Sequence, residues 1–400
     1  MKRAALVMLT TWLVGLGGAR AQEAVTVEQV VRFAREESPV ARALRAELGV
    51  ADAEIDLAGV YPNPVLAYAG FGRFDGSANA INGTQHQLWF DVPLLLAGQH
   101  DARRAVAAAA ALTARAEADA ALLDLEVDVR RAFLDLLTAQ EREARLASAR
   151  DELADLRRVV EQRAGAGAQS QYDSMRIAVE MARVQAVLAV TTADLRAAST
   201  RLAALVGRSG WSPRAQGSLD VGLRAPGAID DIPAVRAARA RVVEAERDVD
   251  RAERERVPEV RLGAGAYFTT DGDSSSAFLG LAIPLPVFDT GEAAVRQAQA
   301  ARASAQEAQR ATVALVEARL EGALSVLEAR RAALATFDAD TFARLPELQQ
   351  MAEAAYRLGA SGVFELLDAF GARLDVQLAR IELQMTTVSA EIDVLEVAGP

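Results

Sequence analysis

The sequence predicts a mainly α-helical protein with a small β part, and three observations support this fold class. Alanine-rich stretches without proline or glycine, such as the one from Gln99 to Arg163, favour very long helices. Two pairs of short alternating segments, each around a polar turn, are typical of β-hairpins. Half of the 400 residues are hydrophobic but only 5% are aromatic, so closely packed helices suit the chain better than a thick globular core.

The first residues have the pattern of an export signal. Lys2 and Arg3 precede an apolar stretch over residues 4–18, and Ala19-Arg20-Ala21 fits a small-residue cleavage site. We therefore expect residues 1–21 to be a cleaved signal peptide, with a short N-terminal anchor helix as the alternative. No later segment has the roughly 20 uninterrupted apolar residues of a membrane-spanning helix.

The mature chain reads as two similar units. Phe90–Leu94 resembles Leu281–Leu285, and Gly167–Asp173 resembles Gly359–Glu365. Each unit is expected to contain a helix, a hairpin and a pair of long helices. The predicted division is a first repeat over 22–207, with its hairpin at 65–92 and long helices at 99–207, a Gly/Pro/Ser-containing linker at 208–229, and a second repeat over 230–400, with its hairpin at 260–285 and long helices at 290–398.

The first unit opens with a helix expected over Val27–Gly59, which Pro62-Asn63-Pro64 brings to an end. In the segment that follows the first hairpin turn, Leu88, Phe90 and Val92 alternate with Gln85, Gln87 and Asp91, so that one face of the strand is apolar.

The hairpin strands have the length and pattern of membrane strands. Each is 8 or 9 residues long with one apolar face, and Trp89, Phe90 and Phe268 lie near the ends. Edge hairpins on a soluble sheet are the alternative interpretation. Four strands are too few to close a barrel, and open strand edges are not tolerated in hydrocarbon. If the strands lie in a membrane, several chains must share one barrel.

The long helical segments have a coiled-coil pattern. Leu320, Leu327 and Leu334 keep a seven-residue step, and many neighbouring seam positions are alanine, which permits close helix approach. Pro346 is expected to kink the helix of the second unit. A soluble coiled-coil rod has the same pattern.

Composition excludes several classes of function. The absence of cysteine excludes disulfides, thiolate metal sites, cysteine nucleophiles and lipid attachment to an N-terminal cysteine. The two histidines, His86 and His100, lack metal-ligand spacing, and a net charge of −11 argues against nucleic acid as a partner. The sequence has no nucleophile–base set, phosphate loop or metal cluster, so we expect no catalytic residue, no cofactor and no enzyme activity.

In their order along the chain, four motifs resemble those of the TolC-like outer membrane efflux family. They are Val25-Thr26-Val27-Glu28-Gln29, Pro62-Asn63-Pro64, Ile283-Pro284-Leu285-Pro286-Val287-Phe288-Asp289 and Tyr356-Arg357-Leu358-Gly359-Ala360-Ser361. The second and third are most similar to the heavy-metal (CzcC-like) branch.

The resemblance implies a homotrimer whose strands close one twelve-stranded barrel in the outer membrane, continued by a helical coiled-coil barrel into the periplasm. It further implies a periplasmic adaptor protein and an inner-membrane pump, of the RND type, as partners. The implied function is an exit duct that passively conducts metal cations or small toxic compounds. A soluble periplasmic coiled-coil adaptor or scaffold is the alternative, as is the outer membrane duct of type I protein secretion.

The same resemblance places acidic residues at a periplasmic aperture. Glu365 and Asp368 follow Gly359 and lie three residues apart, on one helix face, and rings of carboxylates favour cations. Asp173 is the equivalent of Glu365 in the first unit, whereas Arg176 replaces Asp368. An ordinary solvated acidic face is the alternative for the acids, and for the glycines the alternative is that they only permit the turns. The residues expected to dock the adaptor are Arg163, Gly167, Arg357, Gly359 and Ser361.

Overall fold

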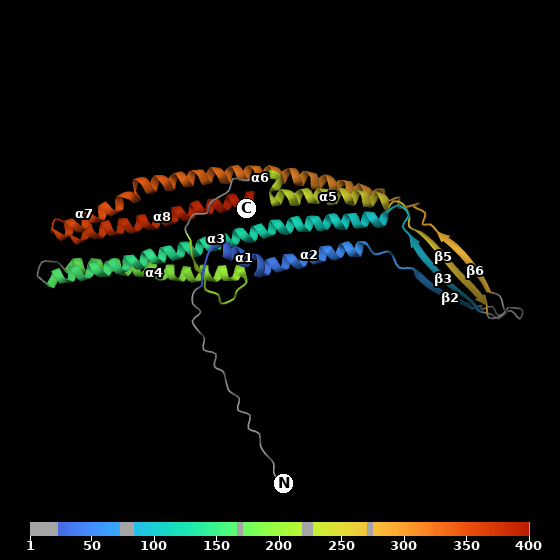
Figure 1. The fold of residues 1–400 in the computed structure, drawn as a ribbon, viewed down its shortest axis with the longest axis horizontal. Helices are drawn as coiled ribbons and strands as arrows, with labels where there is room; N and C mark the ends of the chain where they lie inside the picture. Colours follow the sequence, from blue (N-terminus) through green and yellow to red (C-terminus); the bar gives the residue numbers. More distant parts are fainter. Residues whose placement is uncertain (1–22, 73–83, 166–170, 218–226, 270–274, 400) are drawn as a thin grey trace, which may run out of the picture.

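A computed structural model describes the main chain of residues 23–72, 84–165, 171–217, 227–269 and 275–399. Long helices run side by side along an extended body, and a small sheet lies at one end (Figure 1). The opposite end is formed by helix tips. The protein is therefore mainly helical with a small sheet, as the sequence predicts.

The helix expected over Val27–Gly59 is two helices, so the prediction of one continuous helix is wrong. Helix α1 spans Val27–Glu37 and helix α2 spans Pro39–Ala58. Between them Ser38 caps α2, because its Oγ accepts a hydrogen bond from the backbone N–H of Val40 at 3.3 Å. Proline lacks an N–H and suits the first helical turn, so Pro39 begins a new helix at this point.

Two long helices follow the first hairpin and form the middle of the body. Helix α3 spans Gln99–Gly165 without interruption, and α4 spans Gln171–Val206 and packs against it. A buried cluster joins α1, α3, α4 and the linker, and includes Val30, Leu136 and Leu202. Strands β1 (Ala24–Val25) and β4 (Arg214–Ala215) pair in parallel beside this cluster.

The sheet has four antiparallel strands in the order β2-β3-β5-β6. Strands β2 (Val65–Gly72) and β3 (Thr84–Leu94) form one hairpin, and β5 (Val260–Thr269) and β6 (Ser275–Ala282) form the other. The two hairpins meet through β3 and β5. Strands β2 and β6 are consequently the outer strands of this sheet.

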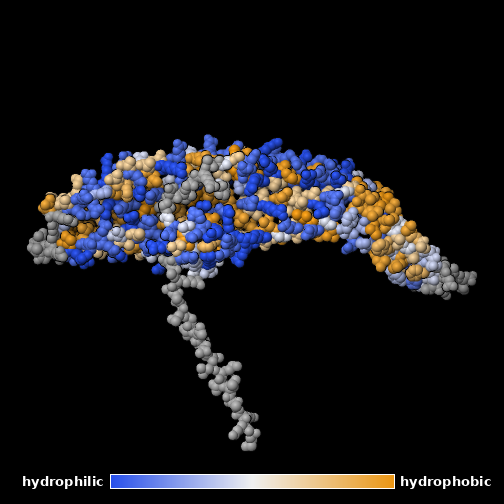
Figure 2. Space-filling view, viewed as in Figure 1, coloured by the Kyte–Doolittle hydropathy of each residue, from blue (hydrophilic) through white to orange (hydrophobic). Residues whose placement is uncertain are grey.

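One face of the sheet is apolar and exposed. The register places Leu88 beside Tyr68, and Phe90 beside Leu66. Five side chains of this face are 50–84% exposed, namely Leu66, Tyr68, Leu262, Leu279 and Leu281. Figure 2 shows a hydrophobic band over the strands.

Trp89 lies on the other face of the sheet, with Gln87 and Asp91. Successive side chains of a strand point to opposite faces, which separates Trp89 from Phe90. The indole stacks on Phe278 of β6, with ring centroids 5.0 Å apart. Trp89 and Phe90 lie in the middle of β3, so the prediction that they lie near a strand end is wrong.

The second half of the chain continues with a short 3₁₀ turn, η1 (Ile229–Asp231), and helix α5 (Pro233–Arg254). After the second hairpin, α6 spans Glu292–Asp340 and α8 spans Val363–Ala398, with the shorter α7 (Leu345–Arg357) between them. None of the described helices is both long enough and apolar enough to cross a bilayer.

The interruption between α6 and α7 lies before Pro346, and not at it as expected. Thr341 and the 3₁₀ turn η2 (Phe342–Arg344) separate the two helices. Pro346 occupies the first turn of α7, where its missing N–H costs no hydrogen bond. The proline therefore marks the start of the second helix, and the bend falls on the residues before it.

Candidate aperture at the helical tip

The tip of the molecule is held together by an apolar cluster that joins four helices. Leu153 of α3, Ile177 of α4, Tyr356 of α7 and Phe370 of α8 are all buried in it. This cluster fixes where α4 and α8 begin relative to each other. The expected aperture residues lie on the first turns of those two helices.

Glu365 and Asp368 are both exposed on the first turns of α8. The Glu365 carboxylate accepts a hydrogen bond from the backbone N–H of Gly362, with Oε2 and N 3.0 Å apart. Glu365 therefore caps the helix, and its negative charge also suits the positive end of the helix dipole. Neither acid forms an ion pair within the described residues.

Asp173 lies on the first turn of α4 and is half-buried. Three residues later, Arg176 extends towards α8, with its guanidinium carbon 5.5 Å from the ring centre of Phe364. The structure thus brings a cation of the first unit beside the residue that precedes Glu365. The sequence identifies Arg176 at the first tip but not its contact with Phe364, because the two residues are far apart in the chain.

The residues expected to dock an adaptor fall on both tips. Gly359 follows α7 with a φ of +71°, a conformation that favours glycine, and a side chain there would have open space. Ser361 donates its backbone N–H to the carbonyl of Ala355 at 3.3 Å. The main chains of Arg163 and Arg357 are helical, but their side chains lie outside the described part, as does all of Gly167.

Arg373, which the sequence analysis did not single out, joins three helices near this tip. From α8, its guanidinium forms an ion pair with Glu152 of α3 and donates a hydrogen bond to Oε1 of Gln349 on α7 at 2.9 Å. The Arg373 side chain is only 14% exposed. Removing its charge would leave the α3 and α8 helices without this tie, so Arg373 holds the tips of the two helix pairs together.

A second arginine on the same face, seven residues further along α8, holds the bend between α6 and α7. Arg380 donates two hydrogen bonds to the carboxylate of Asp338, at 2.7 and 3.0 Å, and lies 4.4 Å above the ring of Phe342. The hydrogen bond lowers the pKa of Asp338. The pair therefore stabilises the fold above the ordinary pKa of aspartate, and this contribution is lost as pH falls through the lowered value. Arg373 and Arg380 are seven residues apart on α8, and this spacing in the sequence indicates that both lie on the same face of the helix.

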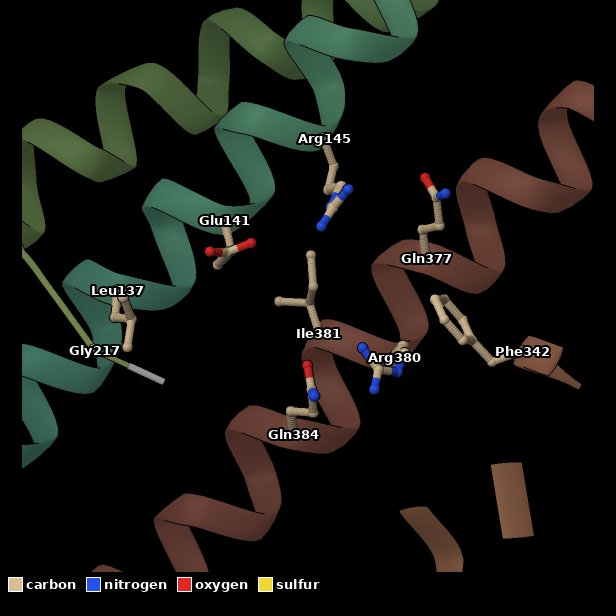
Figure 3. Close-up of a pocket in the computed structure, with 9 residues that line it drawn as sticks. All are labelled: Leu137, Glu141, Arg145, Gly217, Phe342, Gln377, Arg380, Ile381 and Gln384. Atoms are coloured by element: carbon tan, nitrogen blue, oxygen red, sulfur yellow. The ribbon is translucent and has the colours of Figure 1, made fainter. Parts of the chain in front are cut away.

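A polar cavity of about 200 Å³ separates α3 from α8 further from the tip. Figure 3 shows Glu141 and Arg145 of α3 directed towards side chains of α8. The lining residues are Leu137, Glu141, Arg145, Gly217, Phe342, Gln377, Arg380, Ile381 and Gln384. This set has charge of both signs but no nucleophile beside a base, so it has no evident catalytic chemistry.

Within the described residues, no three His, Asp or Glu side chains are grouped so that they could hold a metal ion. The charged residues at the tip are instead single carboxylates and arginine ion pairs. Such an arrangement can attract, repel or gate an ion, but it does not build a coordination shell.

Comparison with known proteins agrees with this architecture. The profile of the family described as outer membrane efflux protein matches residues 30–208 and 227–399. The cobalt-zinc-cadmium resistance protein CzcC of Cupriavidus metallidurans is 28% identical over 370 residues, which cover 89% of this chain and 85% of CzcC.

Solved structures show the same fold. A CusC structure superposes with a TM-score of 0.79 at 16% identity, covering 93% of this chain and 92% of CusC. The outer membrane protein VceC of Vibrio cholerae gives a TM-score of 0.75 at 20% identity, covering 93% and 96% of the two chains.

The elongated helical body that ends in a four-stranded sheet is thus the fold shared with the CusC and VceC structures. The chain belongs to the outer membrane efflux protein family. Members of this family are transport channels and not enzymes, which agrees with the absence of a catalytic set from the sequence.

Proposed function

We propose that this protein is the exit duct of a tripartite efflux system, which passively conducts substrate from an inner-membrane pump and a periplasmic adaptor to the outside. The observation that supports this proposal most is the sheet, because an exposed apolar face on strands of membrane-spanning length suits lipid. The helical body would then extend into the periplasm.

The two outer strands of the sheet support an assembly of several chains. In the described sheet, β2 and β6 each pair on one side only. An open edge in hydrocarbon leaves backbone groups without hydrogen bonds, at a cost of several kcal/mol for each group. Pairing β2 of one chain with β6 of the next removes every edge. Three chains would close a twelve-stranded barrel, so the homotrimer is part of the proposal.

At the other end, three copies of Glu365 and Asp368 would meet around the axis of the trimer. Their exposure and lack of ion pairs within the described residues support an aperture that attracts cations. Asp173 would add a half-buried carboxylate nearby. The ion pair between Arg373 and Glu152 would hold the tip closed, because it ties the α7/α8 pair to α3.

The proposed cargo is metal cations or small toxic compounds. The likeness to CzcC, a protein named for cobalt, zinc and cadmium resistance, supports the metal alternative. The proposed partners are a periplasmic adaptor, docked at Arg163, Gly167, Arg357, Gly359 and Ser361, and an RND-type pump. The same proposal includes the removal of residues 1–21 on export. It also includes the division of the mature chain into a first repeat (22–207), a linker (208–229) and a second repeat (230–400).

Cell fractionation followed by electrophoresis of unheated and boiled detergent extracts, beside crosslinked samples, tests this function. We expect the protein in the outer membrane as a trimer that boiling dissociates. A soluble periplasmic monomer or dimer would contradict the duct and favour a coiled-coil adaptor.

The aperture has a test of its own. Replacing Glu365 and Asp368 together with alanine is expected to raise single-channel conductance or to weaken cation preference in a planar bilayer, since the carboxylate ring is removed. The matched control is the double variant Glu317→Ala and Glu321→Ala, which removes the same charge from exposed positions on α6. Unchanged conductance and selectivity in the tip variant would reject the aperture assignment.

A further inference from the structure

The polar face of the sheet carries three aromatic rings in contact. Trp89 of β3 stacks on Phe278 of β6 with an interplanar angle of 18°, and Tyr267 of β5 lies 4.6 Å from Phe278 between ring centroids. The three rings therefore extend over three neighbouring strands. They share this face with Gln87 and Asp91.

Glycines of β5 and β6 lie directly beneath these rings. A Cβ atom added to Gly263 would lie 2.2 Å from Cζ2 of Trp89, and one added to Gly280 would lie 2.5 Å from Cη2. A Cβ added to Gly265 would lie 2.5 Å both from Phe278 and from the backbone oxygen of Leu88. None of the three has a positive φ, so space for the rings, and not backbone conformation, requires glycine here.

The indole therefore lies along the sheet, since it begins on β3 and reaches residues of both β5 and β6. It covers the glycine backbone and also stacks on Phe278. Filling the space above glycines in this way stabilises strand pairing, and this packing role alone would account for the glycines. It does not account for the carboxylate beside the rings.

Asp91 lies two residues after Trp89, on the same face, and is 7% exposed. No hydrogen bond or ion pair of its carboxylate is found in the part of the chain that the structure describes. The nearest cation along this face of β5, Arg261, lies 3.6 Å from the carboxylate of Glu259. The charge of Asp91 is thus left uncompensated beside an aromatic surface.

We propose that Trp89, Tyr267, Phe278 and Asp91 form a weak binding site for planar organic cations on the inner wall of the duct. This inference rests on the proposed function, because only a closed barrel turns this face towards water. Aromatic faces attract cations within about 6 Å of the ring centre, and the effect is greatest for Trp. A weakly hydrated organic cation gains both the ring contact and the carboxylate, whereas a strongly hydrated metal ion favours oxygen ligands alone.

A weak site at this position suits transport. Conduction requires binding that is favourable enough to admit a substrate and weak enough to release it. The trimer would present the site three times at one level of the barrel. The cargo of the duct would then include organic cations as well as, or in place of, metal ions.

Tryptophan fluorescence of the purified trimer gives a test that does not depend on transport. The chain has three tryptophans, and Trp12 lies in the expected signal peptide, so the Trp211→Phe variant reports on Trp89 alone. N-methylpyridinium serves as the planar cationic quencher, and acrylamide serves as the neutral one. We expect saturable quenching by N-methylpyridinium and linear quenching by acrylamide.

Adding Asp91→Asn to this background is expected to weaken the apparent affinity for N-methylpyridinium by roughly fivefold, because the carboxylate no longer attracts the cation. Quenching by acrylamide should not change. Asp101→Asn is the matched control, because it removes an exposed carboxylate outside the sheet, at the start of α3.

The outcomes separate this inference from the proposed function. A trimer in which N-methylpyridinium quenches linearly, or in which Asp91→Asn and Asp101→Asn behave alike, overturns the binding site and leaves the duct intact. A soluble monomer overturns the duct and the site together.

Discussion

Replacing Gly263 with valine is expected to remove the assembled trimer from the outer membrane. A Cβ atom at this position would lie 2.2 Å from Trp89, and the two further methyl groups of valine would meet the same indole. Overpacking of a filled site costs about 1–3 kcal/mol, and the trimer would bear that cost in each of its three chains. The measurement is the amount of heat-dissociable trimer recovered from outer membranes.

Two further variants show whether the indole is the cause. Gly70→Ala lies in the same sheet, but its added Cβ would approach only side-chain ends, the hydroxyl of Tyr68 at 3.3 Å and Nδ1 of His86 at 3.8 Å, so we expect nearly normal recovery. Combining Gly263→Val with Trp89→Leu should restore part of the trimer, because the smaller side chain leaves room. Normal recovery of Gly263→Val alone would show that the sheet adapts to the added volume.

Replacing Leu153 with alanine is expected to lower the free energy of unfolding by about 2–5 kcal/mol. Leu153 is fully buried in the cluster that joins α3, α4, α7 and α8. Its loss leaves a cavity where four helices meet, and a well-packed helical tip has little freedom to close it. Thermal unfolding followed by circular dichroism, with the tip monitored by limited proteolysis, measures the effect.

The control for this variant is Arg310→Ala on α6. Arg310 is 73% exposed and pairs with Glu307 one turn before it. Exposed pairs of this kind contribute about 0.2–0.5 kcal/mol, so the melting temperature should change little. If Leu153→Ala unfolds at the same temperature as Arg310→Ala, the tip cluster does not limit the stability of the molecule.

The sequence predicts the fold class because its strongest signals are local. The absence of proline and glycine from Gln99 to Arg163 indicates a helix, and α3 spans this stretch. Alternation of side chains likewise assigns Leu88 and Phe90 to a common strand face. In both cases the residues that carry the signal are neighbours in the chain, so no tertiary information is needed.

The wrong predictions concern single residues whose role depends on position within an element. Ser38 and Pro39 each suit a loop or the start of a helix, and the structure makes them the start of α2. Pro346 similarly begins α7 and does not bend a continuous helix.

The candidate site was predictable only in part. Glu365 and Asp368 were identified from their sequence separation from Gly359. That separation gives no information about the hydrogen bond that the backbone N–H of Gly362 donates to Glu365. The ion pair between Arg373 and Glu152 joins two different halves of the chain, and local patterns do not reveal which distant residues meet. Whether the acids act as an aperture stays a prediction.

The pairing of β3 with β5 also has a consequence for the order of folding. These central strands are separated in the chain by all of α3, α4 and α5, so the first hairpin cannot acquire its neighbour until most of the polypeptide has been made. Contacts over such distances carry a large loop-closure cost and form late. Until then β3 has an unpaired edge and an exposed apolar face, which are the features that promote aggregation. We therefore expect the first half of the chain to need protection from aggregation until β5 of the second hairpin is available to pair with β3.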